Sequence, residues 1–123
     1  MQKAIEKPLL YNGRKFDIRV WVLVTPQYEI YYYNTPYMRT SSSEYSTENM
    51  RSEIHLTNNC QQKHFGEYSK YEDGNTLPMK DTLTAYIASL PGLDLPATEI
   101  MADIIAKMKQ VIIDTLMSAR VVI

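Results

Sequence analysis

Three charged residues alternate along one stretch of the chain, in the order Lys15, Asp17 and Arg19. Because successive side chains of a β-strand point to opposite faces, this spacing places all three on one face. A carboxylate flanked by two cations suits the ribose and phosphates of a nucleotide, or the carboxylate of a substrate. A solvated surface strand would give the same pattern, so the alternation alone leaves both interpretations open.

Two further groups of polar residues are candidates for the same chemistry. Arg39 lies in the middle of a short predicted strand, where it could share the face of Arg19 or be an ordinary edge-strand arginine. Residues 55–59, His-Leu-Thr-Asn-Asn, gather imidazole, hydroxyl and amide groups. These groups could face a phosphate or a metal-bound water, or they could serve as turn and capping groups. His55 and His64 lack the spacing of a zinc site, and the sequence has no glycine-rich phosphate loop.

The elements that would position these residues begin with strands. Residues 15–25 alternate at period two, with five apolar residues on the face opposite the charges, namely Phe16, Ile18, Val20, Val22 and Val24. Pro26 ends this strand, residues 28–33 form the next, and a hairpin is the simplest connection. Residues 37–41 form a short third strand, so we expect an antiparallel meander. Trp21 and Leu23 continue the charged face, which we therefore expect to become covered toward that end.

The second half of the chain is predicted to be helical. Apolar residues from Leu83 to Leu90 recur at helix spacing, and Pro91 with Gly92 ends that helix. Thr98 can cap a longer helix with Glu99 in its first turn. That helix carries a continuous apolar stripe, formed by Met101, Ile104, Ile105, Met108, Val111, Ile112, Thr115, Leu116 and Ala119. Between the halves, residues 44–78 are expected to form a long polar loop of the kind that is usually functional. Strands followed by helices predict an α+β fold.

Length and composition limit the classes of protein to consider. The chain of 123 residues has 45% hydrophobic and 22% charged residues, which predicts a globular domain with one core. A formal charge of −1 gives no electrostatic reason to expect nucleic acid, and no apolar run is long enough to predict a membrane span. The single cysteine, Cys60, fits a reduced cytosolic setting. The apolar end at 121–123 suggests a partial chain, because such an end would pack against further residues.

Several runs of residues, in order, resemble the tubulin–tyrosine ligase-like family. The resemblance covers roughly residues 1–75 well and the last helix more loosely. It is carried by Gln2 to Leu10, Gly13 to Arg19, Trp21 to Thr25, Arg39 to Ser42, His55 to Asn59 with Gln62 and Lys63, and Lys70 to Asn75.

The resemblance implies an ATP-grasp fold, in which two α+β lobes hold ATP. It implies that ATP phosphorylates a carboxylate and that the amine of a free amino acid attacks the acyl phosphate to give an amide. The acceptor would be the C-terminal tail of tubulin, and the amino acid tyrosine or glycine, with glutamate fitting less well. ATP and Mg²⁺ would be the cofactors, and the setting cytoplasmic with association to microtubules, cilia or basal bodies.

The resemblance also implies roles for individual residues. Gln2, Lys3 and Ile5 correspond to the hinge that contacts adenine, mainly through backbone groups. Lys15 and Asp17 correspond to nucleotide contacts. Residues that line the phosphates correspond to Arg39, His55, Thr57 and Asn58. Arg19 corresponds to the arginine that holds a substrate carboxylate near the transferring phosphoryl group, which makes Arg19 and Arg39 the catalytic candidates.

Two parts of the family pattern are not found in these residues. The glycine-rich, lysine-bearing phosphate segment belongs upstream, and the strands with the magnesium ligands belong downstream. We therefore expect residues 1–123 to be a partial ATP-grasp domain with no metal ligands of its own. The alternative is a non-catalytic module that binds tubulin or microtubules, or a fragment of a pseudoenzyme.

Overall fold

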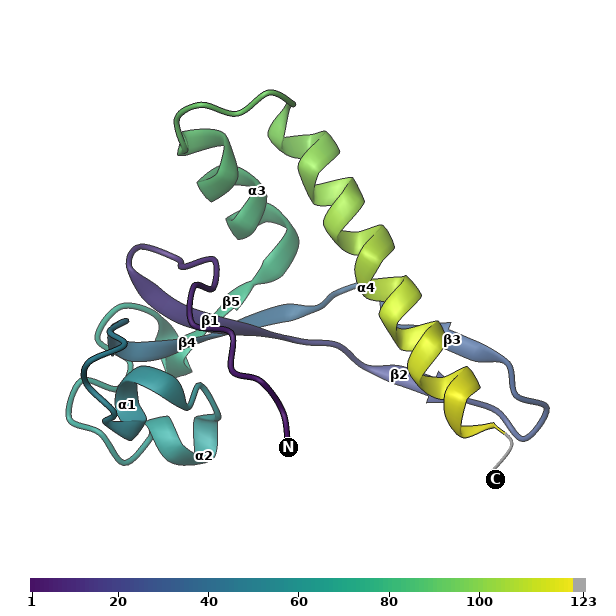
Figure 1. Cartoon of the computed structure of the whole chain (residues 1–123), viewed down its shortest axis with the longest axis horizontal. Coiled ribbons are helices and arrows are strands. Elements are labelled where there is room, and N and C mark those ends of the chain that lie inside the picture. Colours follow the sequence, from purple (N-terminus) through teal and green to yellow (C-terminus); the bar gives the residue numbers. More distant parts are fainter. Residues whose placement is uncertain (121–123) are drawn as a thin grey trace. The chain divides into compact units, whose positions relative to one another are not determined.

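The computed structural model describes residues 1–120, with strands in the first part and the long helices in the last (Figure 1). This order confirms the α+β class with an antiparallel sheet before the helices. The apolar end at 121–123 lies outside the described residues. The elements are β1 Arg14–Arg19, β2 Val22–Val24, β3 Ile30–Tyr32, β4 Tyr37–Glu44, α1 Ser52–His55, α2 Asn59–Gln62, the 3-10 helix η1 Asp73–Asn75, β5 Thr76–Pro78, α3 Met79–Ser89 and α4 Ala97–Ala119.

The chain forms two compact units rather than the one core expected. Unit 1 combines Met1–Arg19 with Pro36–Met79, and unit 2 combines Val20–Thr35 with the residues from Lys80 onward. Each unit buries apolar side chains of its own. These are Met38, Ile54 and Met79 in unit 1, and Leu83, Ile87 and Met101 in unit 2.

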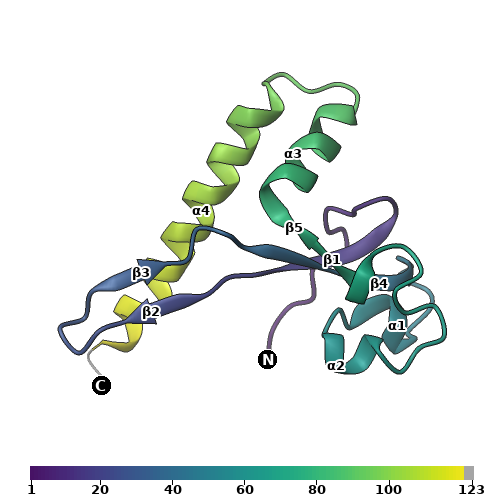
Figure 2. The same ribbon diagram turned by 180° about the vertical axis from the view of Figure 1, so that it is seen from behind.

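Unit 1 is built on a three-stranded antiparallel sheet in the order β1-β4-β5. Asp17 lies opposite Arg39, and Ile18 lies opposite Met38, so the charged and apolar faces of β1 continue across β4. The short helices α1 and α2 lie against β4 (Figures 1 and 2). They and β5 replace much of the polar loop expected at residues 44–78.

The interior of unit 1 is rich in polar groups. Seven polar or charged residues are buried, more than the apolar ones buried there: Arg14, Thr40, Ser41, Ser42, Thr57, Gln62 and Asn75. Buried polar groups cost free energy unless they are hydrogen-bonded, so the fold of this unit depends on how these groups are paired.

Unit 2 contains the expected hairpin, in which β2 pairs with β3 and Val24 lies opposite Ile30. Its strands are shorter than predicted, and the strand expected over 15–25 is interrupted between β1 and β2. Trp21 and Leu23 are 59% and 64% exposed, so the prediction that their face is covered is wrong for the described residues. Helix α4 instead contacts the opposite face, where the ammonium of Lys109 lies 5.0 Å from the ring centre of Tyr32.

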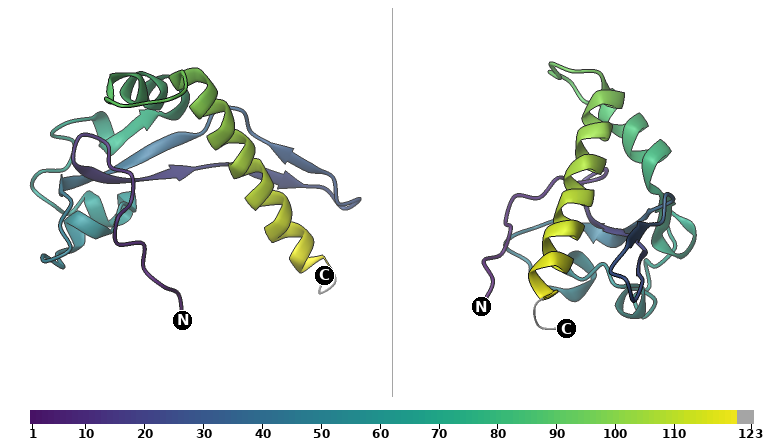
Figure 3. Two further views of the ribbon diagram at one scale, coloured as in Figure 1. Left: turned by 45° about the horizontal axis from the view of Figure 1, so that its top comes forward. Right: turned by 90° about the vertical axis from the view of Figure 1, so that its right-hand side faces the viewer.

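Helices α3 and α4 complete unit 2 (Figure 3). Helix α3 ends before Pro91, as predicted. Helix α4 begins two residues earlier than a Thr98 cap would allow, because the carbonyl of Pro96 accepts hydrogen bonds from the N–H groups of Glu99 and Ile100. Glu99 does lie in the first turn. The apolar stripe is narrower than predicted, since Val111 is 63% exposed and Thr115 is also exposed.

Candidate functional site

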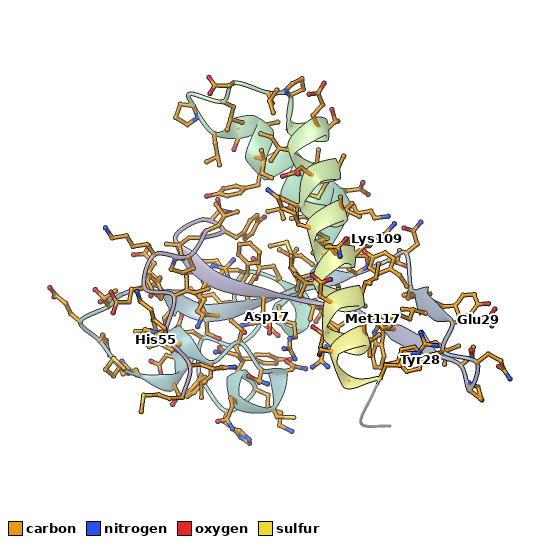
Figure 4. The ribbon with its side chains drawn as sticks, turned by 45° about the vertical axis from the view of Figure 1, so that its right-hand side comes forward. Asp17, Tyr28, Glu29, His55, Lys109 and Met117 are labelled. Atoms are coloured by element: carbon orange, nitrogen blue, oxygen red, sulfur yellow. The ribbon has the colours of Figure 1, made fainter. Side chains whose placement is uncertain are left out.

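The charged face predicted from the alternation is formed by β1 and β4 of unit 1. Asp17 and Arg39 are cross-strand partners, which places Arg39 on the face that carries Lys15 and Arg19. Figure 4 labels Asp17 on this strand. Of the two alternatives that the sequence left open, the structure shows Arg39 on the face of Arg19 and in a central strand, because β4 lies between β1 and β5.

Asp17 and Arg39 form a two-point ion pair. Nε of Arg39 donates to Oδ1 of Asp17 at 2.8 Å, and Nη2 donates to Oδ2. This hydrogen bonding raises the pKa of Arg39 above its ordinary value and holds the guanidinium against β1. The side chain of Arg39 is 12% exposed and that of Asp17 is 36% exposed. The carboxylate is therefore the more open end of the pair and can accept further hydrogen bonds from a ligand.

Arg19 is held differently from Arg39. It is exposed at the end of β1, opposite Tyr37, and no described residue forms an ion pair with it. A cation in this position is available to an anionic group from outside unit 1.

A pocket of about 570 Å³ lies beside this face and contains three of the predicted site residues, Ile5, Lys15 and His55. Its other walls include apolar side chains from the N-terminal segment and from the sheet, such as Pro8 and Phe16. An apolar pocket with a few polar groups at its edge is the common form of a small-molecule site.

Lys15 and His55 lie together in this pocket through a backbone contact. Nζ of Lys15 donates to the carbonyl of His55 at 3.0 Å. The imidazole of His55, labelled in Figure 4, contacts the carbonyl of Asn49 and packs edge-on against Tyr45, with ring centres 5.6 Å apart. The lysine is therefore placed by the last residue of α1, and the imidazole already has contacts of its own.

The N-terminal segment enters the pocket through residues 4–6 and 8. The hydroxyl of Tyr45 donates to the carbonyl of Glu6 at 2.9 Å, which holds this segment against unit 1. Gln2 and Lys3 are exposed and do not line the pocket, so the structure brings only Ile5 of the three hinge residues to this site.

Comparison with known proteins decides the relationship. The model of the tubulin-tyrosine ligase family matches residues 1–122, nearly the whole chain. The chain belongs to the tubulin-tyrosine ligase family. The observed α+β architecture agrees with the ATP-grasp-like fold of this family.

Several relatives of this ligase-family chain are tubulin glycylases. Tubulin glycylase 3B of Tetrahymena thermophila is 34% identical over 98% of the chain, and glycylase 3C of the same organism is 36% identical over 85%. Tubulin monoglycylase TTLL3 of Danio rerio is 45% identical over 53% of the chain. The chain spans about a tenth of the length of each relative: 10%, 10% and 9%.

The other two predicted phosphate-lining residues lie just after α1. Thr57 is buried at 6% exposure, and Asn58 is exposed at the start of α2 without a side-chain capping bond. Neither lines the pocket with Lys15. The structure thus places them in the connection between His55 and α2, and their predicted role remains a prediction.

No group of three or more His, Cys, Asp or Glu residues that could hold a metal ion occurs in the part of the chain that the structure describes. The described helices likewise include none long and apolar enough to cross a bilayer.

Sequence analysis missed the polar residues that hold unit 1 together. Nη1 of Arg14 donates to Glu72 and to the carbonyl of Ser41, both at 3.0 Å, and Nη2 forms an ion pair with the same carboxylate. Thr40 donates to Glu72 at 2.7 Å. These residues belong to runs that resemble the family, and that resemblance was the one signal for them, because single polar residues predict surface or turn positions.

Proposed function

We propose that this chain is the nucleotide-binding part of an ATP-dependent ligase that attaches an amino acid to a tubulin tail. Membership of the tubulin-tyrosine ligase family and similarity to proteins named tubulin glycylases support a ligase that acts on tubulin. ATP dependence and an acyl-phosphate intermediate are part of the proposal; the site in unit 1 supports ATP binding, and the acyl phosphate is what the resemblance to the family implies.

One observation carries the nucleotide part of the proposal. The register of β1 and β4 sets Arg39 against Asp17 on the face of Lys15, and Lys15 also borders the apolar pocket. An apolar pocket suits a purine base, and adjacent cations suit phosphates. Phosphoryl transfer needs mainly positioning and charge neutralisation, which is what such a face supplies. The residues present therefore fit ATP.

The proposed roles follow the position of each residue. The backbone at Ile5 borders the pocket and would contact the base, whereas Lys15 and Asp17 would contact the rest of the nucleoside and the phosphates. Arg39, held in place by Asp17, would neutralise phosphate oxygens. Exposed Arg19 would hold the carboxylate that is activated. Bound ATP would supply the phosphoryl group that turns this carboxylate into an acyl phosphate.

Glycine is the favoured amino acid in this proposal, because the relatives reported above are named glycylases. Tyrosine remains the other candidate and glutamate the weaker one. A ligase with this acceptor would work in the cytoplasm at microtubules, cilia or basal bodies, and Mg²⁺ would be bound by residues other than those described.

A labelling assay tests the ligase proposal. The full-length protein is incubated with tubulin, MgATP and labelled glycine, tyrosine or glutamate in separate reactions, with Arg19→Ala beside it. We expect incorporation of labelled glycine by the wild type. In Arg19→Ala we expect incorporation to fall by about tenfold or more, because a lost charge-assisted hydrogen bond costs about 1.5–3 kcal/mol.

Lys107→Ala is the matched control, since Lys107 is a 76% exposed cation on α4 and should not affect incorporation. Binding of tubulin without incorporation of any amino acid would contradict the ligase proposal and favour the non-catalytic module.

A further inference from the structure

Gln62, the last residue of α2, is fully buried and bonded at both ends of its side-chain amide. Its Oε1 accepts hydrogen bonds from the N–H and the hydroxyl of Ser42 on β4, the former at 3.0 Å. Its Nε2 donates to the carbonyl of Glu53 at 3.2 Å and to that of Leu56. One side chain thus joins β4 to the turn of residues 53–58, which begins within α1.

The turn that Gln62 holds is the one that carries the proposed phosphate-side residues. His55, Thr57 and Asn58 lie beside Leu56 in this turn, and β4 carries Arg39. The neighbouring carbonyl, that of His55, accepts a hydrogen bond from Lys15 on β1. The consecutive carbonyls of His55 and Leu56 are therefore bonded to side chains from two different elements, β1 and α2.

Asn75 offers a direct comparison within the same unit. It is buried at 3% exposure, and its Nδ2 donates to the carbonyl of Thr40 and to the hydroxyl of Ser42, both at 3.0 Å. Its Oδ1 accepts from the N–H of Ser69 at 2.7 Å. Asn75 therefore fixes a different turn to the same strand, and that turn contains no proposed site residue.

We propose that Gln62 is a positioning residue for the phosphate side of the nucleotide site, which rests on the proposed function above. It sets the distance between the turn of residues 53–58 and the Asp17–Arg39 pair by joining the carbonyls of Glu53 and Leu56 to Ser42 of β4. Asn75, by contrast, stabilises unit 1 without setting that distance. The two buried amides thus differ in function although they are alike in burial and in bonding to Ser42.

The test compares Gln62→Met with Asn75→Leu in the full chain. Both substitutions replace a buried amide by an apolar side chain of similar size, so both lower stability. We expect Gln62→Met to weaken MgATP binding at least tenfold in calorimetry, and Asn75→Leu to change it less than twofold. In the ligand-free protein, we expect faster amide hydrogen exchange at residues 53–58 in Gln62→Met alone.

Equal loss of ATP affinity in the two variants, or wild-type affinity in Gln62→Met, would overturn the proposal. If the wild-type chain binds no ATP, the proposed nucleotide site is wrong, and the hydrogen-exchange data alone decide whether Gln62 positions residues 53–58. Faster exchange at 53–58 in both variants, or in neither, would then overturn the positioning role of Gln62. If Gln62→Met does not fold, Gln62→Glu replaces it, because a carboxylate keeps both contacts with Ser42 and loses the amide donor to the turn.

Discussion

Two ion pairs in unit 1 differ in how far their charges are buried. The side chains of Arg14 and Glu72 are 3% and 8% exposed, whereas Asp17 of the other pair is 36% exposed. Removing one partner of a buried pair leaves the other charge without compensation, which costs much more than breaking a surface pair. We therefore assign a structural role to Arg14 and Glu72, whereas the more open pair of Asp17 and Arg39 is the one we propose for ligand binding.

Glu72→Gln tests the structural role of the buried pair. We expect the free energy of unfolding to fall by about 3–5 kcal/mol in urea denaturation, because Arg14 stays buried without its counter-charge. Glu67→Gln is the matched control, since Glu67 pairs with Lys70 at the surface, where both side chains are more than half exposed. That control should lose about 1 kcal/mol or less. Equal effects of the two substitutions would contradict the structural role of Arg14 and Glu72.

Replacing both partners of the buried pair should be less harmful than replacing one. Arg14→Met with Glu72→Leu removes both charges together, so no uncompensated ion remains. We expect this double variant to recover at least about half of the stability lost in Glu72→Gln, measured by the same denaturation. A double variant that is less stable than Glu72→Gln would show that hydrogen bonds to Ser41 and Thr40, rather than charge compensation, account for the cost.

The contact between the β2–β3 hairpin and α4 depends on two tyrosines with opposite hydrogen-bonding states. The hydroxyl of Tyr28 donates to the carbonyl of Leu116, whereas the buried hydroxyl of Tyr32 has no hydrogen-bond partner among the described residues. Figure 4 labels Tyr28 near Met117 of the helix. An unpaired buried hydroxyl destabilises a fold, and a paired one does not.

Phenylalanine substitutions should therefore change stability in opposite directions. We expect Tyr32→Phe to raise the free energy of unfolding by about 1 kcal/mol, because an unsatisfied polar group is removed while the ring that faces Lys109 stays. Tyr28→Phe should lower it by about 1 kcal/mol through loss of the bond to Leu116. Thermal unfolding of the two variants beside the wild type measures both effects. Destabilisation by Tyr32→Phe would show that its hydroxyl is paired after all.

Tyr32 also predicts a dependence of stability on pH. Burial raises the pKa of Tyr32 above its ordinary value of 10.0, so the folded state holds this proton more tightly than the unfolded state. Below about pH 10 the hydroxyl is protonated in both states and does not alter the free energy of unfolding. As the pH rises further toward the raised pKa, the unfolded state releases the proton first, so the free energy of unfolding falls. The loss of stability between about pH 9 and pH 11 should be smaller in Tyr32→Phe than in the wild type. Parallel curves for the two proteins would contradict this assignment.

Across the whole chain, local sequence patterns predicted the helices and strands and which side chains share a strand face. Strand register, the division into two units and side-chain exposure depend on tertiary contacts. Period-two alternation predicted the face of Lys15, Asp17 and Arg19 because a strand fixes which side chains share a face. The pairing of Asp17 with Arg39 depends on the register of strands distant in sequence, which alternation cannot provide. The second unit and the exposure of Trp21 depend on what packs against each face, and no local pattern contains that information.

The polar interior of unit 1 was beyond prediction for a related reason. Residues such as Gln62, Glu72 and Asn75 are usually exposed, so each taken alone predicts a surface or a turn. Their burial follows from bonds to β4 that form only once the segment between β4 and β5 folds back onto it. The resemblance to a ligase family identified their runs without indicating that these side chains are inside.

The most direct measurement is calorimetry of ATP binding, with Mg²⁺, to the purified chain of 123 residues and to Asp17→Ala and Arg39→Ala. Asp94→Ala is the control, because Asp94 is an exposed carboxylate between α3 and α4. We predict measurable binding by the wild type and the control, and a loss of about tenfold or more in each of the other two variants. A folded wild-type chain that binds no ATP, or binding that is unchanged in both variants, would contradict the assignment of this strand face to the nucleotide.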